Sequence, residues 1–96
     1  MANKLGAYTK KKANIENLRE REKLLQRGIE SPKNVTKPLS DSLIGQKKFA
    51  NFKDEKNNIS PLSLNTIKSI SKEIFNTDEG GVTGFEYFDG LRKKLL

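Results

Sequence analysis

The chain has 96 residues, of which 33% are hydrophobic and 32% are charged, so its length suits one small domain with a thin core. It contains no Cys and no His, which excludes disulfides and thiolate chemistry and removes the commonest metal ligand and the usual general base near neutral pH. We therefore expect a protein that is not an enzyme and that needs no metal and no cofactor.

No apolar run approaches the roughly 18 residues that a membrane-spanning helix needs, and the first residues lack the apolar stretch of a signal peptide. We therefore expect a cytoplasmic protein without a membrane partner.

The net charge of +7 is unevenly distributed. Residues 1–48 hold 12 Lys and Arg against 5 Asp and Glu, whereas residues 49–96 hold 7 of each kind. A basic half of this kind favours a polyanionic partner, and nucleic acid is the most frequent one. An acidic protein or a membrane surface would feel the same field, and an AT-rich genome also produces many Lys and Asn codons.

Residues 7–27 are predicted to form a long, basic helix, because they consist largely of the helix formers Glu, Leu, Lys, Arg and Gln. Gly28, followed by Pro32, indicates where the helix ends. Such a helix or arm could lie along a phosphate backbone. The residues expected to contact phosphate are Lys10, Lys11, Lys12, Arg19 and Arg21.

The same helix carries a narrow apolar stripe, which permits a different interpretation. The stripe consists of Tyr8, Ile15, Leu18 and Leu25. These residues could dock the helix on its own domain, or they could anchor it in the groove of a protein partner. The chain would then be an interaction adaptor or an inhibitor that binds through residues 7–27.

After a connector that ends near residue 37, a second helix is predicted over residues 41–52, with Ser40 or Asp41 as its cap. Gly45 weakens this prediction, so the helix is expected to be irregular or broken. Phe49 and Phe52 lie one turn apart and are assigned to the core. Residues 53–58 contain no apolar side chain and are predicted to form a loop, in which residues 57–59 could support one short extended pair.

The next helix, over residues 61–75, is the best-specified element. Ser60 before Pro61 is a typical helix start, and Ser63 is a second candidate cap. At 100° per residue, one side of the helix collects the apolar residues Leu64, Ile67, Ile70, Ile74 and Phe75. The opposite side collects Asn65, Lys68, Ser69 and Lys72.

That polar side has the composition of a groove-reading helix. The amide and hydroxyl of Asn65 and Ser69 suit base edges, and the ammonium groups of Lys68 and Lys72 suit phosphates. An ordinary amphipathic surface helix in a Lys- and Asn-rich protein would show the same side chains.

A turn-rich acidic loop follows, and the sequence from Thr83 to Glu86 then resembles a capping box, with Val82 and Tyr87 placed for a hydrophobic staple. The helix predicted over residues 84–95 should pack its apolar side on the preceding helix. Asp89 is expected to face water.

These predictions together describe an all-α protein. Residues 1–37 would form the basic N-terminal helix and connector, and residues 38–96 a compact three-helix core, with the order but not the short connector of a helix-turn-helix. The first functional hypothesis is a non-enzymatic, DNA-binding accessory or regulatory protein, a type found among mobile elements and recombinases. Binding to RNA fits the charge equally well, but no aromatic strand motif for base stacking is present.

Overall fold

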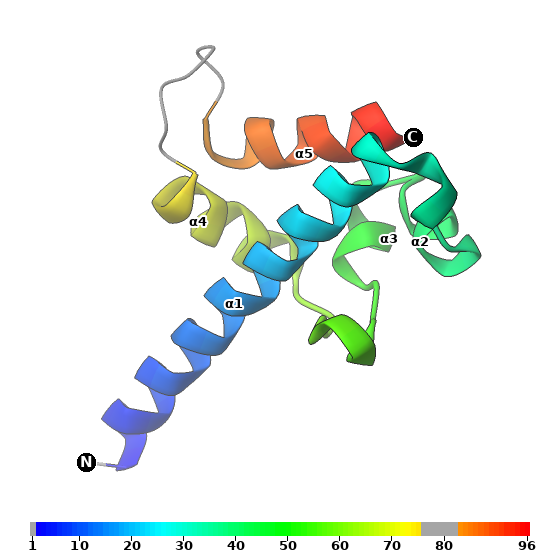
Figure 1. Cartoon of the computed structure of the whole chain (residues 1–96). Helices are drawn as coiled ribbons and strands as arrows, with labels where there is room; N and C mark the ends of the chain where they lie inside the picture. Colours follow the sequence, from blue (N-terminus) through cyan, green and yellow to red (C-terminus); the bar gives the residue numbers. More distant parts are fainter. Residues whose placement is uncertain (1, 76–82) are drawn as a thin grey trace.

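The computed structural model describes residues 2–75 and 83–96, with side chains from residue 10 onward. These residues form an all-α fold (Figure 1). The α-helices are α1 (Ala2–Glu30), α2 (Lys37–Ser42), α3 (Gln46–Ala50), α4 (Leu64–Ile74) and α5 (Gly84–Leu95). Two short 3-10 helices, η1 (Pro32–Asn34) and η2 (Glu55–Asn57), lie in the connections. Within the described ranges, no helix is both long and apolar enough to cross a membrane.

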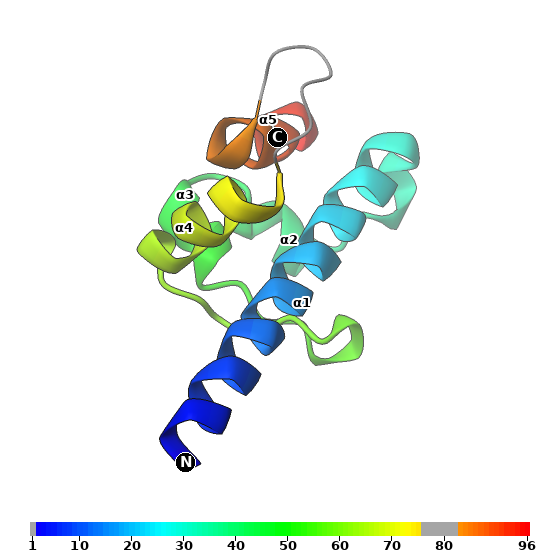
Figure 2. The ribbon, with the colours of Figure 1, turned by 90° about the vertical axis from the view of Figure 1, so that its left-hand side faces the viewer.

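The first helix extends beyond the predicted residues 7–27 at both ends. It does not stop at Gly28, because that residue is buried in a packing contact: a Cβ atom there would lie 2.7 Å from Leu95 Cδ2 and 3.1 Å from Val35 Cγ2. The missing side chain thus lets the end of α1 approach the end of α5. The other end of α1 projects away from the remaining helices (Figure 1, Figure 2).

The helix predicted over residues 41–52 is replaced by two short helices. Thr36 caps the first of them, its hydroxyl oxygen accepting a hydrogen bond from the backbone N–H of Leu39 at 3.4 Å, so α2 begins before Ser40. Gly45 has an extended backbone and separates α2 from α3. The break occurs where glycine weakened the prediction.

The segment from α3 to α4, residues 51–63, is longer than the three or four residues of a helix-turn-helix connection. It contains η2 and one antiparallel bridge, in which Asp54 N donates to Ile59 O at 2.8 Å and Ile59 N donates to Asp54 O at 2.9 Å. Asn58 takes the left-handed conformation that the turn requires. The predicted short extended pair is thus confirmed as a single bridge.

The last two helices lie close to their predicted positions. Ser63, rather than Ser60, caps α4 by accepting from the N–H of Thr66 at 3.1 Å. α5 begins at Gly84 as predicted, but the side chain of Thr83 makes no capping hydrogen bond, so the predicted capping box is not formed. Val82, the other half of the predicted staple, lies outside the described residues.

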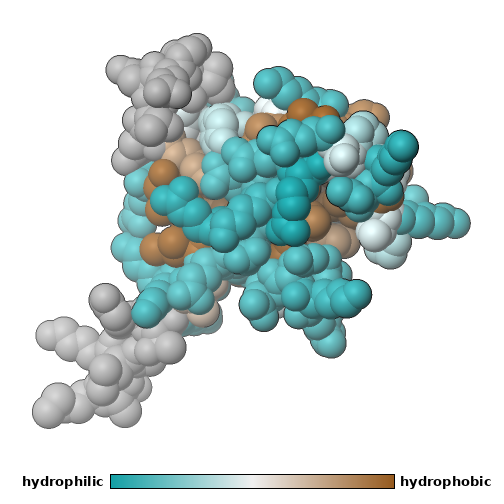
Figure 3. Space-filling view, in the orientation of Figure 1, coloured by the Kyte–Doolittle hydropathy of each residue, from teal (hydrophilic) through white to brown (hydrophobic). Residues whose placement is uncertain are grey.

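The core draws on α1 as well as on the four later α-helices. Leu18 and Leu25 are fully buried in the same cluster as Phe49, Ile67 and Phe88. This differs from the prediction that residues 38–96 alone make the compact part, and the chain from Leu18 onward shares one core. Figure 3 shows the result on one face, where hydrophilic side chains cover most of the surface and hydrophobic ones form small patches.

Aromatic rings tie the later helices together within this core. The ring centroid of Phe49 lies 6.1 Å from that of Phe52 and 5.7 Å from that of Phe88, and the centroid of Phe88 lies 5.8 Å from that of Phe75. The assignment of Phe49 and Phe52 to the core is confirmed.

Candidate nucleic-acid interface

One face of α4 presents the four polar residues that its helical period predicted. Asn65, Lys68, Ser69 and Lys72 are all exposed, while Ile67 and Ile70 on the other side are buried. We call these four residues the α4 face. Among the described residues, the side chains of Asn65, Ser69 and Lys72 make no hydrogen bond or ion pair, so the fold leaves their polar groups available.

The α4 face is bordered by α5. The ammonium nitrogen of Lys68 lies 5.5 Å from the centroid of the half-buried Phe85 ring, a cation–π distance that favours one position for this charge. Beside it, Gly84 lies close to the α4 backbone, since a Cβ atom there would be 3.7 Å from Lys72 Cα. Packing of α5 against α4 therefore supports the α4 face along this border.

One of the basic residues near the start of α1 reaches the other border of the α4 face. Lys10, Lys11 and Lys12 are all exposed, and we call them the α1 cluster. Lys11 Nζ lies 3.3 Å from Glu73 Oε1, so this ion pair joins α1 to the last turn of α4. The structure thus places the α1 cluster beside the α4 face, although the two are about 60 residues apart in the chain.

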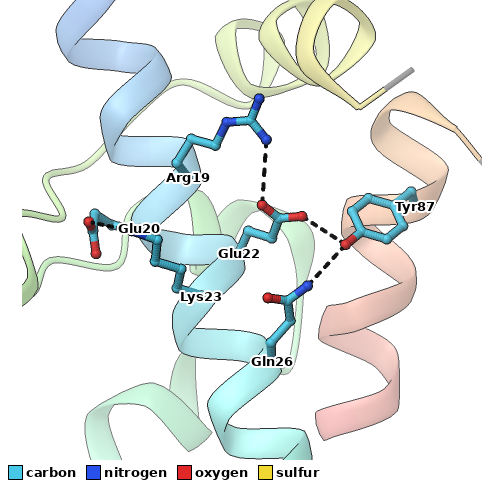
Figure 4. Close-up of polar contacts among 6 residues, drawn as sticks. All are labelled: Arg19, Glu20, Glu22, Lys23, Gln26 and Tyr87. Carbon is cyan, nitrogen blue, oxygen red and sulfur yellow. Dashed lines mark hydrogen bonds and ion pairs between the residues drawn. The ribbon is translucent and has the colours of Figure 1, made fainter. Parts of the chain in front are cut away.

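Arg19 is half-exposed and takes part in the contact of α1 with α4 and α5. Its guanidinium carbon lies 5.7 Å from the centroid of the Phe75 ring, and its Nη1 lies 3.7 Å from Glu22 Oε1. Figure 4 shows how Glu22 continues this network: Tyr87 Oη donates to Glu22 Oε2 at 2.7 Å and accepts from Gln26 Nε2 at 3.2 Å. Burial and the hydrogen bond to the Glu22 carboxylate raise the pKa of Tyr87, so the phenol stays protonated.

Arg21 does not lie on the surface, and its prediction as a phosphate-binding residue is corrected. Its side chain is fully buried and ties α1 to the end of α3 and to the segment between α3 and α4. Nε donates to Asn17 Oδ1 at 2.9 Å, and the two Nη atoms donate to the carbonyl oxygens of Phe49, Ala50, Phe52 and Ser60. Burial lowers its pKa to about 10, which leaves the guanidinium charged at neutral pH.

The anchors predicted for a protein partner are largely used by the core. Leu18 and Leu25 are fully buried, so they are not available for docking in this fold, and that prediction is corrected. Ile15 is half-buried beside an open hollow of about 490 Å³ that is also lined by Lys11 and Glu16. The side chain of Tyr8 lies outside the described residues.

Asp89 of α5 belongs to a buried ion pair with Arg92. Asp89, which was expected to face water, is buried, and its Oδ1 accepts from Arg92 Nε at 2.7 Å. Gln46 donates to its Oδ2 at 3.1 Å, and Arg92 Nη1 donates to the carbonyl oxygen of Leu43 at 2.6 Å. These contacts join α5 to α3 and to the end of α2.

Sequence reasoning missed the two buried arginines, although a signal for one of them exists. Arg21 lies three residues after Leu18 and four before Leu25, which places it within their stripe on a helix of 3.6 residues per turn. A basic residue between two apolar ones at this spacing is a candidate for burial with hydrogen-bond partners.

No protein-family model, curated protein or solved structure matches this chain.

Proposed function

We propose that this chain is a non-enzymatic protein that binds nucleic acid and that its ligand is duplex DNA. The observation that supports the proposal most is the α4 face itself: two ammonium groups, an amide and a hydroxyl at i, i+3, i+4 and i+7, all exposed on one helix. The opposite side of that helix is anchored in the core.

In the proposed complex, the α4 face lies in the major groove. Asn65 and Ser69 contact base edges, since an amide offers both a donor and an acceptor and a hydroxyl can serve as either. Lys68 and Lys72 contact phosphates on either side, and such contacts position the helix without reading sequence. A helix-turn-helix is not required for this geometry, because α4 is held by packing against α5 and α3.

The α1 cluster supplies further phosphate contacts. It lies where α1 passes the last turn of α4, next to the end of α1 that projects away from the other helices (Figure 1). Lys10 and Lys12 have no ion-pair partner among the described residues, and Lys11 is paired with Glu73. Arg19 is held by Glu22 and Phe75 and contributes to the local positive field more than to a direct contact.

Two features favour duplex DNA over RNA. The major groove of A-form RNA is too narrow and deep for a helix to read. Single-stranded RNA is bound mainly by stacking on exposed aromatic rings, whereas Phe85, the ring beside the α4 face, is half-buried beneath Lys68.

The test combines the substitutions Lys68→Ala and Lys72→Ala in one variant and measures fluorescence anisotropy with a labelled duplex across a salt series. Each lost phosphate contact should make the slope of log K against log salt shallower by about 0.9, so the double variant should lose about 1.8. Affinity should fall similarly for duplexes of unrelated sequence, because the lost contacts are to the backbone.

The matched control is Lys33→Ala with Lys37→Ala, which removes the same charge from exposed positions. These residues lie in η1 and at the start of α2, on the other side of the molecule from α4 (Figure 1, Figure 2). Equal losses in the two double variants would show that only overall charge matters, and would count against the α4 face. A separate Asn65→Ala variant should change the preference among duplex sequences and leave the salt slope unchanged.

A further inference from the structure

The two basic surfaces of the proposed interface meet at a carboxylate. Glu73 is the only acidic residue in α4, and it lies in the last turn, next to Lys72. Its Oε1 lies 3.3 Å from Lys11 Nζ, the middle residue of the α1 cluster. A negative charge therefore occupies the border between the α4 face and the α1 cluster, where a phosphate backbone would pass.

This ion pair contributes little to the fold. The side chains of Lys11 and Glu73 are 59% and 53% exposed, and pairs this exposed add little to stability because solvent and salt screen them. The direction of α1 is already fixed, since the helix is continuous and Leu18 and Leu25 hold it in the core. The main consequence of this ion pair is therefore electrostatic.

We propose that Glu73 is a specificity-determining residue of the interface, and that it restrains sequence-independent binding to phosphate. The inference rests on the proposed function. Glu73 neutralises Lys11 and repels phosphate within a Debye length, which is about 8 Å at physiological salt. Weakening the phosphate contribution gives more weight to the contacts of Asn65 and Ser69 with base edges.

The decisive variant is Glu73→Gln, which keeps the shape of the side chain and removes its charge. It should bind duplexes of unrelated sequence about two- to fivefold more tightly at 0.15 M salt, the size of effect that one exposed charge pair can give. Its salt slope should become steeper by about 0.9, because Lys11 then neutralises one more phosphate.

The matched control is Glu55→Gln, which breaks another exposed ion pair, that of Glu55 with Lys53 at 3.0 Å. Both views show α1 passing between η2, which contains Glu55, and α4 (Figure 1, Figure 2). The overall charge changes equally in the two variants, but Glu55 lies far from the α4 face. Its affinity should change less than twofold, with an unaltered salt slope.

A double-mutant cycle shows whether Glu73 acts through Lys11. The substitution Lys11→Ala should weaken binding less than twofold in the wild type, where Glu73 occupies the ammonium group, and about fivefold in the Glu73→Gln background. Additive effects, or equal affinities of Glu73→Gln and Glu55→Gln, would overturn the inference. The proposed function would fail differently, through a wild-type protein that does not bind duplex DNA or that ignores the Lys68 and Lys72 substitutions.

Discussion

At the scale of single residues, two buried arginines hold segments of this small, polar chain together through hydrogen bonds to backbone carbonyl oxygens. Arg21 satisfies backbone carbonyl oxygens at the end of α3 and in the segment between α3 and α4, where the chain has little regular structure to do so. Asn17 assists by donating to the carbonyl oxygen of Ser60 at 2.8 Å. This polar network holds the segment that leads into α4.

Replacing Arg21 by Ala should therefore lower the free energy of unfolding by about 3 kcal/mol or more, because several buried carbonyl oxygens would lose their donor. A small domain is stable by only about 5–15 kcal/mol, so the loss should be large in a urea titration. The exposed Arg27 provides the control, and Arg27→Ala should cost less than about 1 kcal/mol. Equal costs in the two variants would contradict the structural role of Arg21.

The buried ion pair of Asp89 with Arg92 makes the stability of the fold depend on pH. Burial alone raises the pKa of Asp89, but hydrogen bonds from Arg92 and Gln46 and the charges of Arg92 and Lys93 outweigh it and lower the pKa below its ordinary value of 3.8. A carboxyl group whose pKa is lower in the folded state stabilises that state above its unfolded pKa. This stabilisation is lost as the pH falls below about 4, through the folded pKa.

We therefore expect the wild type to be more stable than Asp89→Asn by about 1–3 kcal/mol at pH 7, because the variant loses a charge-assisted contact. The difference should shrink at pH 3, because the carboxyl group of the unfolded wild type, which has the higher pKa, then binds a proton and favours unfolding. Urea unfolding of both proteins at the two pH values measures this. A difference that is the same at pH 3 and pH 7 would show that the charge of Asp89 does not contribute.

At the scale of elements, local sequence signals were sufficient for α4 and α5 and insufficient elsewhere. The apolar period of α4 and the range of α5 could be predicted because their buried and exposed sides differ clearly. The end of α1 could not, because Gly28 is a helix-ending signal locally, whereas its contact with Leu95 involves residues far along the chain. The start of α2 could not be predicted either, because Thr36 supplies the cap and the local sequence offered Ser40 and Asp41 as alternatives.

The glycines of α5 have opposite roles, which gives a prediction at this scale. A Cβ atom at Gly90 would meet no described atom within 4 Å, so Gly90→Ala should stabilise the protein by about 0.5–1 kcal/mol through helix propensity. Gly84 has a φ of 60°, so Gly84→Ala should destabilise it by about 1–2 kcal/mol. Thermal unfolding should shift upward in the first variant and downward in the second, by about 4–8 °C per kcal/mol. Shifts of the same sign would refute the distinction.

At the scale of the whole molecule, one long helix serves two purposes. The part of α1 that holds Asn17, Leu18 and Leu25 is buried in the fold, whereas the part before it carries the α1 cluster and ends in turns that project (Figure 1). Sequence reasoning separated the basic segment from the compact domain because the apolar residues of α1 are sparse. Their depth in the core depends on Phe49 and Phe88, which no local pattern connects to them.

The candidate site was predictable to the extent that it lies on one element. The spacing of Asn65, Lys68, Ser69 and Lys72 placed them on one side of a helix, and they share an exposed face in the structure. Their proximity to Lys11 could not be predicted, since it depends on how α1 crosses α4. The same is true of Arg21, whose charge suggested a surface contact that its burial excludes.

The central claim, that the α4 face and the α1 cluster bind duplex DNA, is tested most directly by anisotropy of the wild-type protein with duplex DNA, single-stranded DNA and RNA of equal length across a salt series. We expect the tightest binding to duplex DNA, with log K falling linearly as log salt rises, by about 0.9 for each phosphate neutralised. Absence of binding to all three ligands at low salt would contradict the claim, and preferential binding to RNA would contradict the assignment of the ligand.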